Sequence, residues 1–366
     1  MIRRTAALAT VVAVLASGCT SGPGGDDGAA PSARPSGSTT GSPSGSPSGS
    51  PSGAATSVPE SSGIPAPTQD AAAALPAVHS RSSLPALMRQ PPSGGRPRIV
   101  RTELQTDDYT RYDVAYRSDR LTVSGVLLRP KGPGPFPAIV LNHGYIEPSI
   151  YVTGQGLARE QDALARAGFV VLHTDYRGHA ASDPVPQLDR ETRLGYTRDA
   201  VNAVAALQAL PYVDDERLAM LGRSMGGGVT MNALVTQPGL VDAAVVYDSV
   251  SSSFLDNLDH FTRVGRPEAV EALFDRFGTP SQSPRFYREL SPRTYFDRIS
   301  EPLLVHHGTA DATCPPAWAR TTQRLMREAG VDSRLRWWPG EDHAFYARWQ
   351  DSMDLTLRFL RQRLGT

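Results

Sequence analysis

The segment LGRSMGGG at 221–228 contains a serine flanked by glycines, and these residue types at this spacing could form part of a catalytic site. The pattern Gly-x-Ser-x-Gly presents a nucleophilic serine when it forms a sharp turn between a strand and a helix. A chain with 33 glycines also contains ordinary glycine-rich turns, so the flanking segments decide the interpretation. The apolar run 217–224 reads as a strand and 225–237 as a helix, and we therefore predict that Ser224 is a nucleophile.

A serine hydroxyl needs a base to become a good nucleophile. Among eight histidines, His343 in GEDHAF follows the last expected strand and precedes the last expected helix. The carboxyl ends of parallel strands meet at one edge of a sheet, which is also where Ser224 is expected. We predict His343 as the base.

The base in turn needs a carboxylate to orient it. Asp311, in HHGTADATCPP, follows another expected strand at the same edge. The order Ser224, Asp311, His343 is the order of the α/β-hydrolases, which favours Asp311. Asp248, in VVYDSV, also ends a strand after the nucleophile and stays an alternative acid.

Acyl transfer also requires hydrogen-bond donors for a developing oxyanion. We expect the backbone N–H groups of Met225 and Tyr145, the second of which follows the strand ending in LNHG. Glu147, in the same loop, is either a group that pairs with a substrate amine or a solvated acid. Cys314, three residues beyond Asp311, is expected to be a buried, inert thiol.

The elements that position these residues alternate between strand and helix. Expected strands lie at 136–144, 169–176, 217–224, 242–250, 302–308 and 334–340, after a hairpin of 112–118 and 121–130. Expected helices lie at 156–168, 193–211, 225–237, 317–330 and 344–364. This alternation predicts an α/β fold with a mostly parallel central sheet and helices on both faces. The long interval 251–301 predicts a mainly helical cap insertion beside the site.

The N-terminal part predicts export and anchoring. Residues 1–18 combine two arginines with a short apolar stretch, as signal peptides do, and end just before Cys19. Small residues before that cysteine resemble the lipidation site of bacterial lipoproteins, with an ordinary cleaved signal as the alternative. Residues 19–96 are expected to be a disordered Ser/Gly/Pro-rich tether, and 97–366 the catalytic domain. We therefore expect an extracytoplasmic protein anchored to the membrane through lipid on Cys19.

The composition excludes several other classes. The formal net charge is zero, which gives no indication of a nucleic-acid partner. The chain has only two cysteines, Cys19 and Cys314, so neither a disulfide framework nor a cysteine-based zinc site is expected. No phosphate-binding loop follows a strand, and we expect no cofactor and no metal.

Five segments together resemble the catalytic domain of the prolyl oligopeptidase (S9) family of α/β-hydrolases: LNHGY, DYRGHAASD, YVDDERLAMLGRSMGGG, HHGTADATCP and GEDHAF. The resemblance covers roughly 110–365. It implies the α/β-hydrolase fold and a triad of Ser224, Asp311 and His343 that forms an acyl-enzyme on a small peptide or ester. A serine peptidase is the first expectation. A carboxylesterase and a non-catalytic binding lipoprotein remain the alternatives.

Overall fold

The computed structural model describes residues 74–366. The predicted signal peptide, Cys19 and most of the predicted tether therefore lie outside the described residues. Among residues 74–366, no helix combines the length and apolar composition needed to cross a membrane.

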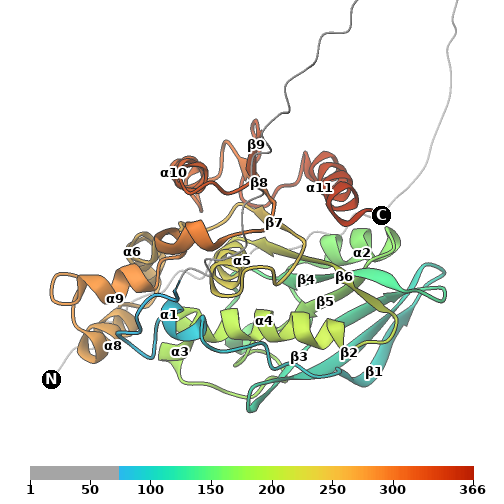
Figure 1. The fold of residues 1–366 in the computed structure, drawn as a ribbon, viewed down its shortest axis with the longest axis horizontal. Helices are drawn as coiled ribbons and strands as arrows, with labels where there is room; N and C mark the ends of the chain where they lie inside the picture. Colours follow the sequence, from blue (N-terminus) through green and yellow to red (C-terminus); the bar gives the residue numbers. More distant parts are fainter. Residues whose placement is uncertain (1–73) are drawn as a thin grey trace, which may run out of the picture. The chain divides into compact units, whose positions relative to one another are not determined.

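A nine-stranded sheet in the order β1-β2-β3-β5-β4-β6-β7-β8-β9 forms the centre of the domain (Figure 1). Its first four strands in that order pair antiparallel, and all remaining neighbours pair parallel. The strands are β1 Arg98–Gln105, β2 Tyr109–Ser118, β3 Leu121–Pro130, β4 Phe136–Asn142, β5 Val170–Thr174, β6 Val213–Arg223, β7 Ala243–Tyr247, β8 Leu303–Gly308 and β9 Ser333–Trp338. The predicted mostly parallel sheet and its N-terminal hairpin are confirmed.

Strand β1 was not predicted, and the exposure of all its residues explains why. All eight of its residues are exposed, because it forms the sheet edge beside β2. A strand with no buried face shows no alternation of apolar and polar residues, which is the pattern that identifies strands in a sequence. Only its pairing with β2 makes it a strand.

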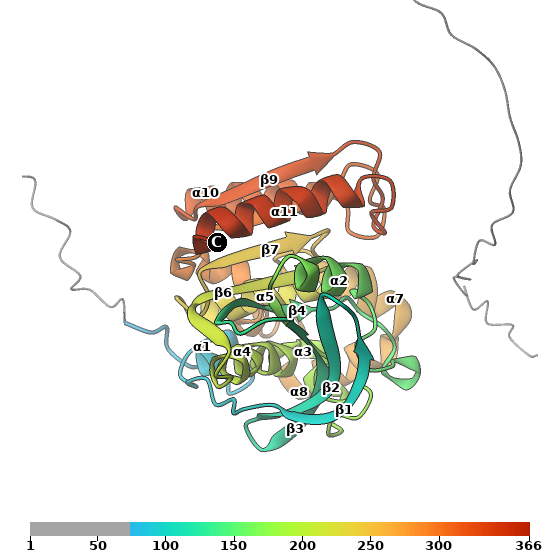
Figure 2. The same cartoon turned by 90° about the vertical axis from the view of Figure 1, so that its right-hand side faces the viewer.

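The helices are α1 Leu84–Leu87, α2 Ala158–Arg166, α3 Gln187–Thr192, α4 Leu194–Gln208, α5 Met225–Thr236, α6 Phe254–Asn257, α7 Arg263–Gly265, α8 Pro267–Phe277, α9 Pro284–Glu289, α10 Pro316–Glu328 and α11 Trp349–Leu364, with shorter helical turns at Pro148–Ile150, Leu258–Thr262 and Pro292–Arg298. Helices α4, α5 and α10 cover one face of the sheet, and α2 and α11 cover the other (Figures 1 and 2). Each face has its own apolar core, because the central strands are buried on both sides.

The predicted boundary at residue 97 is wrong for residues 74–96. Leu84 is fully buried in the core that α4 and α5 also line. Ser93 donates a backbone hydrogen bond of 2.8 Å to the side chain of Asn202 on α4. The short apolar segment at 84–88 gains enough burial to hold this stretch on the domain, so the folded part begins before residue 97.

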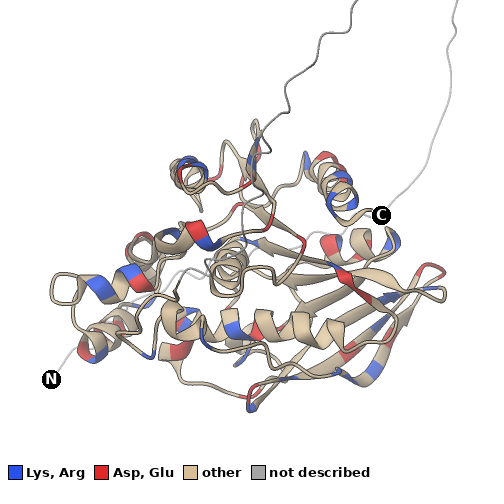
Figure 3. Cartoon of the chain, in the orientation of Figure 1, with Lys and Arg blue, Asp and Glu red and all other residues tan. Residues whose placement is uncertain are grey.

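The interval between β7 and β8 is the predicted helical insertion. Residues 251–301 contain α6, α7, α8 and α9 and the turns between them, which extend from the sheet beside α3 (Figure 1). Basic and acidic residues are interspersed along many of the helices and strands in this view (Figure 3). Arg266 and Glu268 of the insertion line a cavity that Met225, the first residue of α5, also lines.

Candidate active site

Ser224 occupies the turn that joins β6 to α5. Its backbone angles are φ +54° and ψ −121°, in a region that side-chain-bearing residues rarely adopt. The turn is held in place because the Ser224 N–H donates to the Tyr247 carbonyl at 2.9 Å, and the Ser224 carbonyl accepts from Val250 at 3.2 Å. A strained strand-to-helix turn of this kind, here residues 222–226 and called the elbow below, lifts the serine side chain above the sheet edge.

The flanking glycines leave room for this turn. A Cβ atom on Gly222 would overlap the carbonyl oxygen of Gly226, and one on Gly226 would overlap the carbonyl oxygen of Asn142. The elbow is therefore packed backbone against backbone, and glycine is required at both positions for lack of space.

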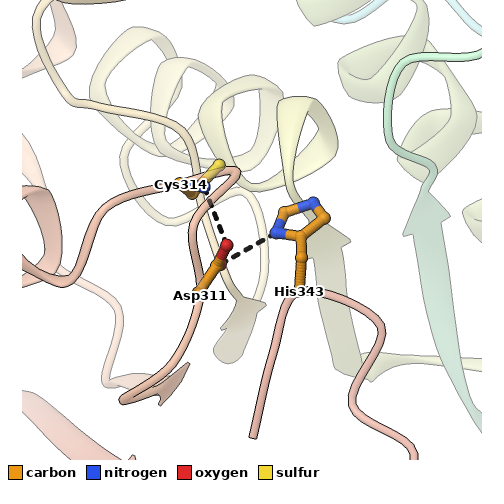
Figure 4. Close-up of side chains that lie close together, drawn as sticks. All are labelled: Asp311, Cys314 and His343. Atoms are coloured by element: carbon orange, nitrogen blue, oxygen red, sulfur yellow. Dashed lines mark hydrogen bonds and ion pairs between the residues drawn. The ribbon is translucent and has the colours of Figure 1, made fainter.

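Asp311 and His343 are hydrogen-bonded to each other in the loops that follow β8 and β9 (Figure 4). His343 Nδ1 lies 2.8 Å from Asp311 Oδ2, and the other carboxylate oxygen accepts the N–H groups of Thr313 at 2.9 Å and Cys314 at 2.8 Å. Asp311 is 2% exposed, whereas a quarter of the His343 side chain is exposed. A proton on Nδ1 leaves Nε2 free to accept one.

Cys314 connects this pair to the serine. Its sulfur lies within 4.8 Å of ligand atoms of both Asp311 and His343, and Ser224 is among its neighbours. Burial raises the pKa of the Cys314 thiol well above its ordinary value, so the thiol is neutral, as the sequence predicted. Asp311, His343 and Cys314 thus lie together, and Ser224 forms the turn before α5.

Asp248, the alternative acid, is also close but makes different contacts. Its Oδ1 accepts the N–H of Gly308 at 2.9 Å, and its Oδ2 has no hydrogen-bond partner among the described residues. Burial raises the pKa of Asp248 to about 7. The hydrogen bond to His343 is made by Asp311 and not by Asp248, which favours Asp311 as the acid.

Two sets of side chains have the spacing of metal ligands: Asp311, Cys314 and His343, and Asp248, His307 and Asp311. A thiol binds metal as a thiolate, and burial opposes ionisation of Cys314. His307 Nε2 is bonded to the Cys314 carbonyl at 2.9 Å. Burial of the thiol therefore disfavours the first set, whereas in the second set the Nδ1 of His307 has no hydrogen-bond partner among the described residues.

The predicted oxyanion donors lie on either side of Ser224. Met225 begins α5, and Tyr145 follows Gly144, where an added Cβ would lie 3.2 Å from the Ser224 Cβ. Within residues 74–366, neither the Met225 N–H nor the Tyr145 N–H donates a hydrogen bond. Both donors are therefore available to a ligand at the serine. The Tyr145 hydroxyl instead donates to Glu147 Oε2 at 2.7 Å.

Two arginines hold the loop that carries His343, a feature that the sequence analysis missed. Arg223 Nη1 donates to the carbonyl of His343 at 3.3 Å. Arg159, on α2, donates to the carbonyls of Ala344 at 3.0 Å and Phe345 at 3.2 Å. Three consecutive carbonyls are thus held by guanidinium groups, which orients the backbone that presents His343.

Arg223 is itself fixed by a buried acid. Its Nη2 lies 2.9 Å from Glu160 Oε1, which also accepts a hydrogen bond of 3.0 Å from the Trp349 indole. Glu160 is 2% exposed, so this ion pair is desolvated. No local sequence pattern predicts this ion pair, because Glu160 and Arg223 are far apart in the sequence.

A cavity of about 320 Å³ opens beside the serine. Its lining comes from the loop after β4, from α3, and from the starts of α4, α5 and α8. The lining residues are Tyr145, Glu147, Pro148, Gln187, Arg190, Glu191, Arg193, Tyr196, Met225, Arg266 and Glu268. A polar cavity therefore lies next to the candidate nucleophile, Ser224.

Comparison with known sequences finds a peptidase family and individual peptidases. The prolyl oligopeptidase family matches residues 156–366 of this chain. The uncharacterized peptidase YtmA of Bacillus subtilis (strain 168) is 27% identical over 202 residues, which cover 55% of this chain and 73% of that protein. Dipeptidyl aminopeptidase BIII of Pseudoxanthomonas mexicana is 26% identical over 244 residues, 64% of this chain, but only 34% of that protein is covered.

Solved structures share the fold. The acetyl xylan esterase from Paenibacillus sp. R4 has a TM-score of 0.59 at 21% identity, with 77% of this chain and 92% of that chain covered. The similarity covers most of the domain and shows that the two proteins share a fold.

Proposed function

Because the chain belongs to the prolyl oligopeptidase family, we propose that this serine hydrolase cleaves small peptides through an acyl-enzyme formed on Ser224. The observation that carries the proposal is the 2.8 Å hydrogen bond between His343 and Asp311 at the sheet edge where Ser224 forms the elbow. Peptidase action is favoured because the relatives that match over more than half of the chain include peptidases.

In the proposed mechanism, His343 Nε2 accepts the Ser224 proton as the hydroxyl oxygen attacks the substrate carbonyl. Asp311 holds the ring in the required tautomer and stabilises the imidazolium. The N–H groups of Met225 and Tyr145 bind the oxyanion, and His343 then gives the proton to the leaving group. Water attacks the acyl-enzyme by the same route and releases the acid.

The same groups would also cleave esters, which makes a carboxylesterase the second candidate. An alkoxide leaves more readily than an amine, so ester cleavage depends less on protonation of the leaving group by His343. A quarter of the imidazole side chain is exposed, and the cavity beside Met225 and Tyr145 can take a short acyl group. We therefore expect short-chain esterase activity whichever substrate is natural.

A fluorophosphonate probe tests the proposal, because it reacts only with an activated serine. The wild type should be labelled and Ser224→Ala should not, whereas Ser281→Ala, at an exposed position of the insertion, should label normally. Panels of 4-nitrophenyl esters and aminoacyl anilides would then separate esterase from peptidase. An unlabelled wild type would instead support a non-catalytic binding protein.

We also propose that the protein acts outside the cytoplasm, anchored to the membrane by lipid on Cys19. The support is the charged, then apolar, sequence of residues 1–18 before that cysteine. Cys19→Ala should abolish incorporation of radiolabelled fatty acid and partitioning into detergent, whereas Cys314→Ala should retain both. A wild type that incorporates no lipid would contradict the anchor.

A further inference from the structure

The Arg193 side chain is a partly exposed positive charge in the cavity beside Ser224. It lies between α3 and α4 with φ +59°, and it lines the cavity together with Met225. Its Nη1 lies against the first turn of α5, 3.8 Å from where a Cβ on Gly228 would be. Among residues 74–366, its side chain makes no hydrogen bond and no ion pair.

Two other arginines near this site have acidic partners, whereas Arg190, which lines the same cavity, has none among residues 74–366. Arg177 forms a forked ion pair with Asp199, with a shortest distance of 2.7 Å. Arg266, in the same cavity as Arg193, makes two hydrogen bonds to Glu191 at 2.9 and 3.0 Å. Arg193 is only partly exposed and has no acid hydrogen-bonded to it among residues 74–366, so a bound anion would compensate for its partial desolvation.

Of the cavity acids Glu147, Glu191 and Glu268, Glu191 attracts the Arg193 guanidinium, but none is hydrogen-bonded to it or within ion-pair distance in the described chain. Glu191 is paired with Arg266, and Glu147 accepts the Tyr145 hydroxyl. The Cys314 thiol, which would attract the guanidinium if ionised, is kept neutral by burial. Burial also lowers the pKa of Arg193 itself, an unfavourable effect that a bound carboxylate would reverse.

The position of the cavity indicates which part of a substrate enters it. The leaving group must lie near His343, because the imidazole protonates it. The cavity is lined by both candidate oxyanion residues, Met225 and Tyr145, and not by His343. A substrate with its carbonyl oxygen on those N–H groups would therefore direct its acyl part toward Arg193.

We propose that Arg193 binds a carboxylate on the acyl part of the substrate, so that the enzyme prefers acyl donors that carry a negative charge beyond the scissile carbonyl. The inference rests on the proposed function and specifies its substrate class. A guanidinium suits this role because its planar fork matches the two oxygens of a carboxylate. Arg190, on the same wall, adds positive charge to the cavity.

Two esters of equal length provide the test: the 4-nitrophenyl monoester of adipic acid and that of adipamic acid, in which an amide replaces the carboxylate. For the wild type, kcat/KM should be about 10-fold to 100-fold higher for the acid, the range that a charge-assisted contact supplies. Arg193→Met should bring the ratio close to one. Arg193→Lys should give an intermediate ratio, because it keeps the charge and loses the fork.

Arg276→Met serves as the matched control, because Arg276 is exposed on α8 and does not line the cavity. It should keep the wild-type ratio. If Arg193→Met fails to fold, free adipate should still slow fluorophosphonate labelling of the wild type more than adipamide does. A wild-type ratio near one, or a ratio that survives in Arg193→Met, would overturn the inference.

Different results would contradict the role of Arg193 and the proposed hydrolase function. A wild type that labels with fluorophosphonate and cleaves the neutral ester, yet shows no preference for the acid, contradicts the role of Arg193 alone. A wild type that neither labels nor cleaves contradicts the hydrolase proposal. In that case calorimetry with adipate still tests Arg193, because the wild type should bind adipate and Arg193→Met should not.

Discussion

Arg223 donates a hydrogen bond of 3.3 Å to the carbonyl of His343, so the residue before the candidate nucleophile holds the loop of the candidate base. The two residues are 120 positions apart in the chain. Because Arg223 is also fixed by Glu160, the strand end, the elbow and the histidine loop form one connected unit. This connection makes the relative position of Ser224 and His343 depend on a side chain that performs no chemistry.

Replacing Arg223 by methionine should therefore reduce both activity and stability. We expect kcat to fall by about 10-fold to 100-fold, since small displacements of reacting groups have effects of this size. Stability should fall by about 3–5 kcal/mol, because Glu160 is left buried without its partner. Ester hydrolysis and urea denaturation measure the two effects.

The double variant Arg223→Met/Glu160→Gln separates the two effects. It removes the unpaired charge and keeps an acceptor for the Trp349 indole, so it should recover much of the stability but not the activity. Arg285→Met, at an exposed position, is the control. Full activity in the double variant would show that Arg223 does not position His343.

Asparagine substitutions should distinguish the two candidate acids. Asp311→Asn should lower kcat by about 10⁴-fold, because the amide no longer holds the productive tautomer of His343. Asp248→Asn should have a much smaller effect, because Asp248 is not bonded to His343. Burst and steady-state kinetics with one ester suffice for the comparison. The reverse order of effects would make Asp248 the acid.

Asp248 should also make stability depend on pH. Its pKa in the folded protein is raised to about 7 from an ordinary value of 3.8, so the folded state holds the proton more tightly than the unfolded state. The contribution is fully present below about pH 4 and is lost as the pH rises toward 7. In Asp248→Asn, the free energy of unfolding should fall less between pH 4 and 7 than in the wild type.

Urea titrations at several pH values provide this measurement. Asp297→Asn, an exposed acid in the insertion, should leave the wild-type pH dependence unchanged. If Asp248→Asn and the wild type lose stability equally over this range, Asp248 is ionised in the folded protein throughout.

The elbow should not tolerate a methyl group at Gly226. In Gly226→Ala the new Cβ would meet the carbonyl oxygens of Asn142 and His143, the second at 2.7 Å. We expect a loss of at least about 1–3 kcal/mol, together with weaker fluorophosphonate labelling, because the strand end beside Tyr145 must move. Gly95→Ala, where no atom lies within 4 Å of the new Cβ, should preserve both stability and labelling.

Glu147 should matter for peptides more than for esters. It lines the cavity and is available to pair with a substrate amine, whereas ester cleavage does not require such a contact. Glu147→Gln should lower kcat/KM for aminoacyl anilides by about 10-fold and leave that for acetyl esters within about 2-fold. Equal losses on both substrates would indicate that Glu147 supports the Tyr145 loop and does not recognise an amine.

The sequence was sufficient for the α/β fold, since alternation of buried strands with amphipathic helices is a local property of the chain. Ser224, Asp311 and His343 were predicted in the same way, because each lies at or just after the end of a predicted strand and parallel strands end at one edge. The helix ends were less accurate. The predicted helix 193–211 begins only after Arg193, and the predicted helix 344–364 begins at Trp349, because contacts with α2 hold residues 344 and 345 in a turn.

Other features depended on the tertiary structure. The packing of residues 84–88 on the domain, the pairing of His343 with Asp311, and the arginine contacts to the histidine loop all join segments far apart in the sequence. Whether Arg193 has a partner is likewise a property of everything packed around it. Hydrophobic periodicity records which face of an element is buried, but it carries no information about which distant residue lies against that face, and for this reason only the folded chain reveals these relationships.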